Sequence, residues 1–320
     1  MNIIVRLAWR NLWRHQRRTW LTVGAMVFSN TLLVFMISMQ FGMYDLMIDN
    51  TLKVFTGHMQ VQAPGYKDDQ KMRQTVANVA PLAASLRKKF PSENIAARGW
   101  AFALASSEER SYGVGIFGVE PAFEPQVSSI PGLITEGRYL DDPDAAEIVI
   151  GTVLARNLRV GLGDELTLLG SGRDGSFAAA VATVVGIFES GVTDVDRSIA
   201  QMPLGAFQDT FFMEGAGHQV VISSPTLEAA EGVFSDVAAA LPADAGLVLH
   251  DWDALQPGLK QAIKADMSSA FFMYGILVIL LAFSVLNTQL MSVLERTHEF
   301  GIVMSLGLKP GQLGRLVMLE

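Results

Sequence analysis

The chain of 320 residues has no cysteine, and only 18% of its residues are charged. Without cysteine the protein has no disulfide bond, no thiol nucleophile and no thiolate metal site. Its mean hydropathy is positive, at +0.31, which argues against a simple soluble globule. The sequence also has no G-x-x-x-x-G-K-[ST] segment, so we expect this chain to hydrolyse no ATP by itself.

Patterns typical of an active site or a metal site are missing as well. The histidines are dispersed and form no HExxH pair: His15, His58, His218, His250 and His298. Asp194 and Asp196 lack the rest of a calcium-binding loop, so we predict a solvated turn there. Gly170, Gly172 and Gly175 match a dinucleotide fingerprint, but they fall between two predicted strands, which favours a hairpin turn. We therefore expect no enzyme, no cofactor, no metal and no nucleic-acid partner.

The sequence does contain two long uncharged runs. Arg18 to Asp45 encloses 26 uncharged residues, and Asp266 to Glu295 encloses 28. At about 1.5 Å of helical rise per residue, each run exceeds a hydrocarbon core of about 30 Å. We predict transmembrane helices at 20–43 and within 253–294. A cleaved signal peptide or a buried soluble helix would have a shorter apolar run.

The first 19 residues form a separate basic segment. Arginines recur there at intervals of about four and predict one charged face of an interfacial helix, with tryptophans suited to the headgroup boundary: Arg6, Arg10, Arg14, Arg17, Arg18, Trp9 and Trp13. Clustered arginines mark the cytoplasmic side of a span. The N-terminus is therefore expected inside, and the acidic middle of the chain outside.

The region 44–252 between the spans predicts a mixed α/β domain. Alternating apolar residues and turn signals predict strands at 58–62, 100–105, 112–119, 147–150, 165–169, 178–187, 219–223 and 246–250 and helices at 79–89, 152–159, 204–212 and 226–241. From Asp253 to Glu295 the pattern is helical without a break. About 40 helical residues extend ~60 Å, so this stalk should project beyond the membrane and join the domain rigidly. The predicted fold class is an α+β membrane protein with transmembrane helices flanking a large outer domain.

Several segments resemble one family. The loop after the second span reads ERTHEFGIVMSLG at 295–307 and resembles the cytoplasmic coupling loop of the FtsX-like permease superfamily. The entry LAWRNLWR at 7–14, RRT at 17–19, EIVIG at 147–151, Leu154-Ala155 and GLGDELT at 161–167 are similar to MacB-type exporters and lipoprotein-releasing (Lol-type) permeases, whose core domain is periplasmic. The resemblance implies four spans in the bacterial inner membrane. Residues 312–320 would then begin a truncated third span.

The resemblance also implies a function. It indicates a non-enzymatic ABC transporter permease acting by mechanotransmission, with a separate ATPase subunit, a second permease protomer in a homo- or heterodimer, and a lipid or lipoprotein substrate. A periplasmic chaperone or adaptor is a further candidate partner. The residues expected to contact the ATPase, within a coupling segment at 295–311, are Glu295, Glu299, Phe300, Gly301, Ile302 and Gly307.

Some alternatives stay open. The hairpin at 169–178 is short and rich in glycine, unlike the extended hook with which some Lol-type permeases capture a chaperone. Met36, Met39 and Met43 are candidate acyl-chain contacts, although plain lipid contact explains them better. The main rival function is a MacB-like efflux subunit for drugs, peptides or siderophores. A rival of another class is a two-span sensor or a cell-division regulator.

Overall fold

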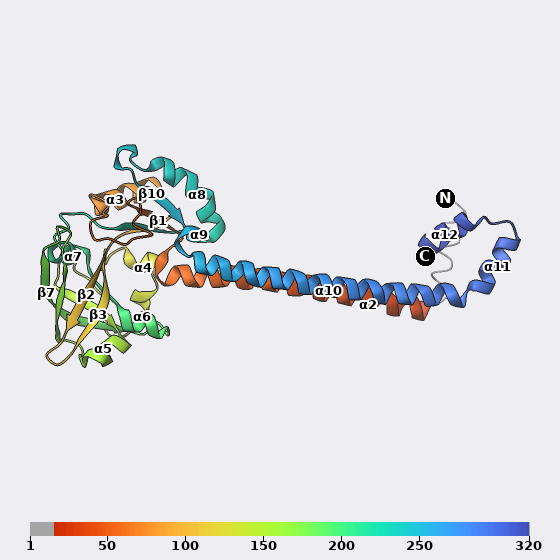
Figure 1. The fold of residues 1–320 in the computed structure, drawn as a ribbon, viewed down its shortest axis with the longest axis horizontal. Coiled ribbons are helices and arrows are strands. Elements are labelled where there is room, and N and C mark those ends of the chain that lie inside the picture. Colours follow the sequence, from red (N-terminus) through yellow and green to blue (C-terminus); the bar gives the residue numbers. More distant parts are fainter. Residues whose placement is uncertain (1–15, 320) are drawn as a thin grey trace. The chain divides into compact units, whose positions relative to one another are not determined.

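A computed structural model of the chain describes residues 16–319 and divides it into two units. Asp45–Lys260 forms the folded domain, and the described residues 16–44 and 261–319 form the helical unit. Figure 1 shows the ribbon with most of the helices and several of the strands labelled. The predicted interfacial helix, with Arg6, Arg10, Arg14, Trp9 and Trp13, lies outside the described residues.

The domain contains a ten-stranded sheet. Its strands are β1 (Met59–Gln62), β2 (Asn94–Ser106), β3 (Ser111–Val119), β4 (Ile134–Gly137), β5 (Glu147–Gly151), β6 (Glu165–Ser171), β7 (Phe177–Phe188), β8 (Ile199–Pro203), β9 (Gln219–Ser223) and β10 (Val248–Asp251). They follow the order β10-β1-β9-β2-β3-β8-β5-β7-β4, and β6 pairs with both β2 and β7. The β3–β8 and β5–β7 pairs are parallel and the others antiparallel.

Helices connect the strands. They are α3 (Val79–Lys89), α4 (Glu124–Val127), η2 (Ile130–Leu133), α5 (Thr152–Leu158), α6 (Thr193–Ser198), α7 (Leu204–Thr210), α8 (Leu227–Ala240), η3 (Ala243–Ala245) and α9 (Trp252–Leu255). Outside these, α2 (Gln16–Thr51) continues into the π-helix η1 (Leu52–Thr56), and α10 (Pro257–Glu295) is followed by α11 (Thr297–Ser305) and α12 (Pro310–Leu319). The mixed α/β content expected from the sequence is confirmed.

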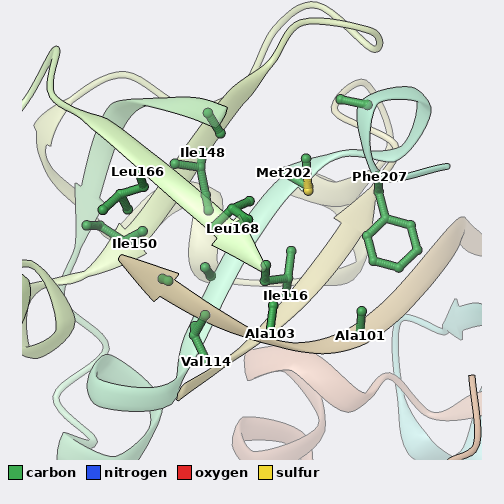
Figure 2. Close-up of a cluster of buried hydrophobic side chains, with 14 of the residues drawn as sticks. Ala101, Ala103, Val114, Ile116, Ile148, Ile150, Leu166, Leu168, Met202 and Phe207 are labelled. Carbon is green, nitrogen blue, oxygen red and sulfur yellow. The ribbon is translucent and has the colours of Figure 1, made fainter. Parts of the chain in front are cut away.

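Strand β2 contributes to two large apolar clusters of the domain. Its first residues pair with β9, whereas its last residues pair with β3 and β6. Beyond Gly99 the strand alternates, so Ala101 and Ala103 point into a large apolar cluster that also contains Ile116, Ile150 and Leu168 (Figure 2). A second cluster packs α3 and α8 against β1 and β9. Successive residues of a strand therefore point to opposite faces of the sheet, and the apolar ones form these clusters.

Two strands were not predicted. β4 has mostly exposed side chains, and β8 is a short run that ends in Pro203. Yet β8 lies inside the sheet, between β3 and β5. The sequence of β8 shows neither alternation of apolar and polar residues nor a turn signal. A strand that is buried between two neighbouring strands needs neither pattern, so the sequence does not identify it.

The predicted continuous helix from Asp253 is wrong at one point. Asp251 caps α9 by accepting a hydrogen bond from the backbone N–H of Ala254 (2.9 Å), and Gln256 then leaves the helical conformation (φ −124°, ψ 61°). Proline at 257 disfavours the α conformation in the residue before it, and its ring suits the first turn of the next helix. The long helix therefore begins at Pro257. The first helix also extends further than predicted, past Met43 to Thr51.

Candidate functional site

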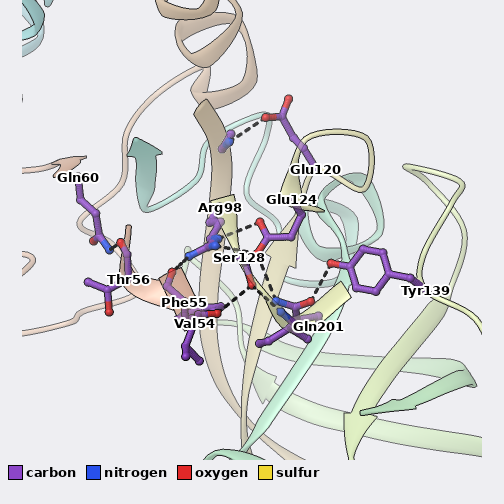
Figure 3. A network of polar contacts seen from close by, with 12 residues as sticks. Val54, Phe55, Thr56, Gln60, Arg98, Glu120, Glu124, Ser128, Tyr139 and Gln201 are labelled. Atoms are coloured by element: carbon purple, nitrogen blue, oxygen red, sulfur yellow. Dashed lines mark hydrogen bonds and ion pairs between the residues drawn. The ribbon is translucent and has the colours of Figure 1, made fainter. Parts of the chain in front are cut away.

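The domain holds the end of the first long helix through its main-chain carbonyl groups. The guanidinium group of Arg98 on β2 donates through Nη1 to the carbonyl oxygen of Phe55 in η1. The hydroxyl of Ser128, just after α4, donates to the carbonyl oxygen of Val54 (3.1 Å). Figure 3 shows both contacts. They satisfy carbonyl groups that the end of a helix leaves without partners, so the helix terminus becomes part of the domain.

Arg98 is itself held by a buried carboxylate. Its Nη2 lies 2.7 Å from Glu124 Oε1 and its Nε lies 3.0 Å from Oε2, and both side chains are 0% exposed. The amide of Gln201 on β8 donates to Glu124 Oε1 at 3.3 Å. Desolvation raises the pKa of Glu124, and the contact with Arg98 opposes that rise. A bidentate buried pair of this kind fixes geometry strongly, because removing either partner leaves an unpaired charge.

Residues around η1 connect both helix ends to the same part of the domain. Gln256, which precedes α10, donates through Nε2 to the hydroxyl of Thr56 at 3.1 Å. Gly57 follows η1 with φ +71°, and a Cβ there would lie 2.4 Å from a methyl group of Val221 and 3.1 Å from the carbonyl oxygen of Ile222. Only glycine fits this turn into β1. The chain therefore enters and leaves the domain at one junction, formed by η1, Arg98, Glu124, Ser128 and Gln256.

Two buried histidines of the domain are structural. His218 Nδ1 accepts the backbone N–H of Trp100 (2.9 Å), so Nε2 carries the proton and faces the carbonyl oxygen of Met72 (3.3 Å). Burial lowers the pKa of His218 to about 4. His58 Nδ1 accepts the backbone N–H of Ser224 (3.2 Å), and its ring is fully buried. Neither ring is open to a substrate.

The expected ATPase-contacting residues lie at the end of α10 and along α11. Glu295 is the last residue of α10, and Glu299 Oε2 accepts from Arg296 Nε at 3.2 Å. Phe300 is only 8% exposed, with the Arg296 guanidinium 5.2 Å from its ring centroid. Gly301 and Ile302 are exposed. Gly307, with φ +101°, follows the end of α11, so the segment is a short helix bounded by a glycine stop.

Two helices within residues 16–319 are long and apolar enough to cross a membrane, at Trp20–Thr56 and Pro257–Glu295. Almost none of their most apolar residues is buried within the chain. They therefore do not behave as core helices of a soluble domain. Arg17 is exposed at the start of α2; Arg18 lies in the same turn.

A polar cluster in the helical unit was not predicted from the sequence. Asp266 on α10 accepts from the Tyr44 hydroxyl (2.5 Å) and from Gln40 Nε2 (3.0 Å), and the Tyr274 hydroxyl donates to Gln40 Oε1 (2.6 Å). A cavity of about 80 Å³ beside it is lined by Ile37, Gln40, Phe41, Tyr44, Met267, Ala270, Phe271 and Tyr274. The exposed side chains of Met36, Met39 and Met43 lie outside this cavity.

The glycine motif at 170–175 and the acidic residue Asp196 have structural roles. Gly170 to Gly175 closes the β6–β7 hairpin, where the Gly172 N–H donates to the Ser176 carbonyl oxygen (2.9 Å). The hairpin prediction is confirmed. The solvated turn predicted at Asp196 is wrong: this side chain is buried in α6 and accepts from the backbone N–H (2.8 Å) and hydroxyl (2.6 Å) of Ser190. In residues 16–319 no cluster of three or more His, Asp or Glu could hold a metal ion.

Sequence reasoning did not identify the junction. Its one signal was Arg98, a charged residue inside the apolar strand run NIAARGWAF at 94–102. A charge in such a run must find a buried partner, because burying it alone is very costly. The partner, Glu124, is 26 residues away in a short helix without a recognisable motif.

Comparison with known proteins relates the chain to one family. The family model described as the MacB-like periplasmic core domain matches residues 19–240, which is more than half of the chain. The lipoprotein-releasing system transmembrane protein LolC of Xylella fastidiosa (strain Temecula1) is 25% identical over 210 residues, covering 63% of this chain and 50% of that protein. LolC of Neisseria meningitidis serogroup B is 24% identical over 226 residues, covering 68% and 54%. The chain thus spans about half the length of the curated relatives it matches.

A solved structure was also matched. The periplasmic region of MacB from Actinobacillus actinomycetemcomitans aligns with a TM-score of 0.47 and 13% identity, covering 65% of this chain and 94% of that one. Because the family model covers residues 19–240, the chain belongs to the family with the MacB-like periplasmic core domain, within the MacB-like and FtsX-like permeases that its motifs resemble.

Proposed function

We propose that this chain is part of the membrane permease of an ABC transporter and works by mechanotransmission. In this proposal α2 and α10 cross the bacterial inner membrane and the domain lies in the periplasm. A separate ATPase dimer binds the segment 295–307 on the cytoplasmic side and drives a movement of α10. The domain follows that movement and acts on a substrate at the outer face of the membrane.

The junction is the observation that supports this proposal most directly. A force transmitted along a helix reaches a domain only if the helix end is fixed to it. Arg98, paired with the buried Glu124, donates to the Phe55 carbonyl oxygen and provides such a fixed point, and Gln256 brings the start of α10 to the same place.

The coupling segment fits the same mechanism. Gly301 and Ile302 are exposed on α11, and a Cβ at Gly301 would meet nothing within 4 Å. A partner could therefore approach this face closely. We propose that Ile302 is the apolar contact with the ATPase and that Glu295 and Glu299 attract its basic residues. Phe300 is buried and packs within this chain instead.

The proposed substrate is a lipoprotein or a related amphiphile, since the curated relatives belong to lipoprotein-releasing systems. The short β6–β7 hairpin indicates whether this chain captures a periplasmic chaperone. Arg73 Nη2 donates to the carbonyl oxygen of Asp174 (3.3 Å) and Arg173 N–H to that of Phe211 (2.9 Å), so the turn is attached to its own domain. We therefore propose that this chain does not capture a chaperone by a hook and is paired with a second permease protomer.

The test is a tryptophan at Gly301 in the complete transporter. Gly301→Trp should lower substrate-stimulated ATPase activity and transport by at least tenfold, because the side chain has room within this chain but obstructs an external partner. Gly232→Trp is the matched control, since Gly232 is exposed on α8 and its Cβ would also meet nothing within 4 Å. Glu299→Lys should act like Gly301→Trp.

Normal coupled ATPase activity with Gly301→Trp would refute the coupling assignment. Transport assays with lipoprotein, and with drugs, peptides or siderophores, distinguish lipoprotein release from MacB-like efflux. A wild-type chain that assembles with no ATPase at all would favour a sensor or a cell-division regulator.

A further inference from the structure

The helical unit contains a small aromatic cavity between its two long helices. The cavity has a volume of about 80 Å³, and half of its eight lining side chains are aromatic: Phe41 and Tyr44 from α2, and Phe271 and Tyr274 from α10. All of its residues belong to the helical unit. Phe41 and Phe271 are exposed, so the cavity is open on their side of the helix pair.

A carboxylate lies beside this cavity and is held there by two of its lining residues. Asp266 Oδ2 accepts from the Tyr44 hydroxyl (2.5 Å) and from Gln40 Nε2 (3.0 Å). The Tyr274 hydroxyl donates to Gln40 Oε1 (2.6 Å), which fixes the orientation of the Gln40 amide. Residues of both helices therefore hold the Asp266 side chain at the edge of the cavity.

No cation among the described residues neutralises this carboxylate. Within residues 16–319 Asp266 forms the two hydrogen bonds given above, both from neutral groups and both to Oδ2. Asp266 is exposed, and its Oδ1 keeps its capacity to accept. Lys264 lies on another side of α10, because residues two apart in a helix do not face each other. A carboxylate at the edge of a membrane span is costly and calls for a partner.

The level of the cavity along the helices indicates where that partner comes from. The first uncharged run ends at Asp45, and the second begins after Asp266. In the proposed topology, Tyr44 and Asp266 therefore lie where the outer leaflet meets water, which is also the level of the phospholipid headgroups. This inference rests on the proposed membrane topology, but not on coupling to an ATPase.

The cavity and the carboxylate together favour an ammonium group. Aromatic rings attract an ammonium ion. An ammonium that donates to the Tyr44 oxygen at about 2.9 Å lies within about 6 Å of the Asp266 carboxylate, a range over which opposite charges still attract each other. An anionic headgroup would instead be repelled by Asp266.

The volume restricts the group that carries the ammonium. A cavity of roughly 150 Å³ accommodates one benzene ring. At about 80 Å³, this one has room for a two-carbon chain with its ammonium, but not for a sugar ring. A trimethylammonium group is bulkier and has no N–H to donate to a carboxylate. A primary ammonium on two carbons fits both conditions.

We propose that this cavity binds the ethanolamine headgroup of an outer-leaflet phospholipid. The ammonium lies against Tyr44 and Asp266, and its two carbons lie among the aromatic side chains. The phosphate stays in water, and the acyl chains follow the exposed apolar surface of α2 and α10. The ligand is a lipid of the surrounding membrane and is not the transported cargo.

Native mass spectrometry of the full chain tests the proposal. The chain is exchanged into an uncharged detergent that contains equal amounts of dioleoyl phosphatidylethanolamine, phosphatidylcholine and phosphatidylglycerol, so that only the headgroup differs. The lipids that stay bound are then counted. We expect the ethanolamine lipid to be retained at least fivefold over each of the others. Free ethanolamine should not displace it, because the acyl chains contribute to binding.

The variants separate the charge from the space. Asp266→Asn keeps an oxygen that accepts from Tyr44 and Gln40 but removes the charge, and should abolish the preference. Asp266→Glu keeps the charge and should retain part of it. Ala270→Leu fills the cavity and should lower retention of the ethanolamine lipid with the carboxylate intact. Asp45→Asn removes an exposed carboxylate outside the cavity and is the matched control, which should change nothing. Thermal unfolding of each variant checks that the fold is retained.

Equal retention of the three lipids by the wild-type chain would overturn this proposal alone. An unchanged preference in Asp266→Asn, or an equal loss in Asp45→Asn, would overturn it as well. Displacement by free ethanolamine would overturn the assignment to a lipid. Retention of no phospholipid at all would overturn the proposal together with the membrane topology on which it rests, so the two failures are distinguishable.

Discussion

At the scale of single residues, the pair of Arg98 and Glu124 has the largest structural consequence. Both side chains are fully buried, and Arg98 also lies with its guanidinium carbon 4.2 Å from the centroid of the Phe55 ring. The pair therefore contacts the sheet, α4 and the end of α2 together. Tyr139 extends this network by donating to Gln201 Oε1 at 2.7 Å. Burial of these groups is tolerable only because almost every polar atom has a partner.

Removing Arg98 alone should destabilise the domain strongly. We expect Arg98→Met to lower the free energy of unfolding by about 3–5 kcal/mol, because Glu124 would remain buried without its cation. Arg98→Met combined with Glu124→Met should recover most of that loss. Denaturant unfolding followed by near-UV circular dichroism measures both. If the double variant is as unstable as the single one, the pair is not the cause of the loss.

The buried histidines make the stability of the domain dependent on pH. His218 is stacked on Tyr66 with ring centroids 5.1 Å apart, and burial lowers its pKa to about 4, with Arg173 nearby acting in the same direction. The unfolded chain, with a pKa near 6.5, gains a proton as the pH falls, but the folded chain does not. Stability is therefore fully present above about pH 6.5 and is lost progressively towards pH 4.

Between pH 7 and pH 5, His218 should lower the free energy of unfolding by about 2 kcal/mol. His58 adds to this loss, since burial lowers its pKa as well. Urea unfolding at the two pH values measures the effect. His218→Gln cannot titrate, so its own loss between pH 7 and pH 5 should be smaller by that amount. An unchanged pH dependence in this variant would assign the effect to other groups.

At the scale of elements, α10 is the helix on which the proposed transmission of movement depends. It runs for 39 residues from Pro257 to Glu295 without interruption, whereas α2 ends in a π-helix that the domain holds by its carbonyl groups. The two helices therefore end differently at the domain. Proline at position 257 starts α10, whereas side chains of the domain bind the carbonyl groups of η1, which follows α2.

Flexibility inside α10 should uncouple the transporter. We expect insertion of Gly-Ser-Gly-Ser between Lys264 and Ala265 to abolish transport while ATPase binding persists, because a flexible segment transmits no displacement. The same insertion after Gly175, in the β6–β7 turn, is the control and should leave transport near its normal rate. Transport and co-purification of the ATPase are measured together. Full transport with the α10 insertion would contradict mechanotransmission through this helix.

At the scale of the whole molecule, the proposed topology places the domain and α11 on opposite sides of the membrane. These 320 residues contain no cysteine, so an introduced cysteine is the only one among them. In spheroplasts, a membrane-impermeant maleimide should label Glu108→Cys, at the exposed β2–β3 turn. It should label Gly301→Cys only after permeabilisation. Labelling of both sites before permeabilisation would refute the topology.

The sequence by itself determined the local elements of this protein. The period-two and helical patterns located α3 and β9 at their observed bounds and predicted the β6–β7 hairpin, because these signals depend on neighbouring residues alone. The two uncharged runs likewise identified both long helices, and the motifs identified the family.

Only the tertiary structure decided how these elements are joined. The position of β8 inside the sheet, the pairing of Arg98 with Glu124 and the hydrogen bonds of Asp266 all depend on contacts between residues far apart in the chain. No local pattern encodes such contacts, since a buried charge or amide is stabilised by whichever distant group the fold brings to it.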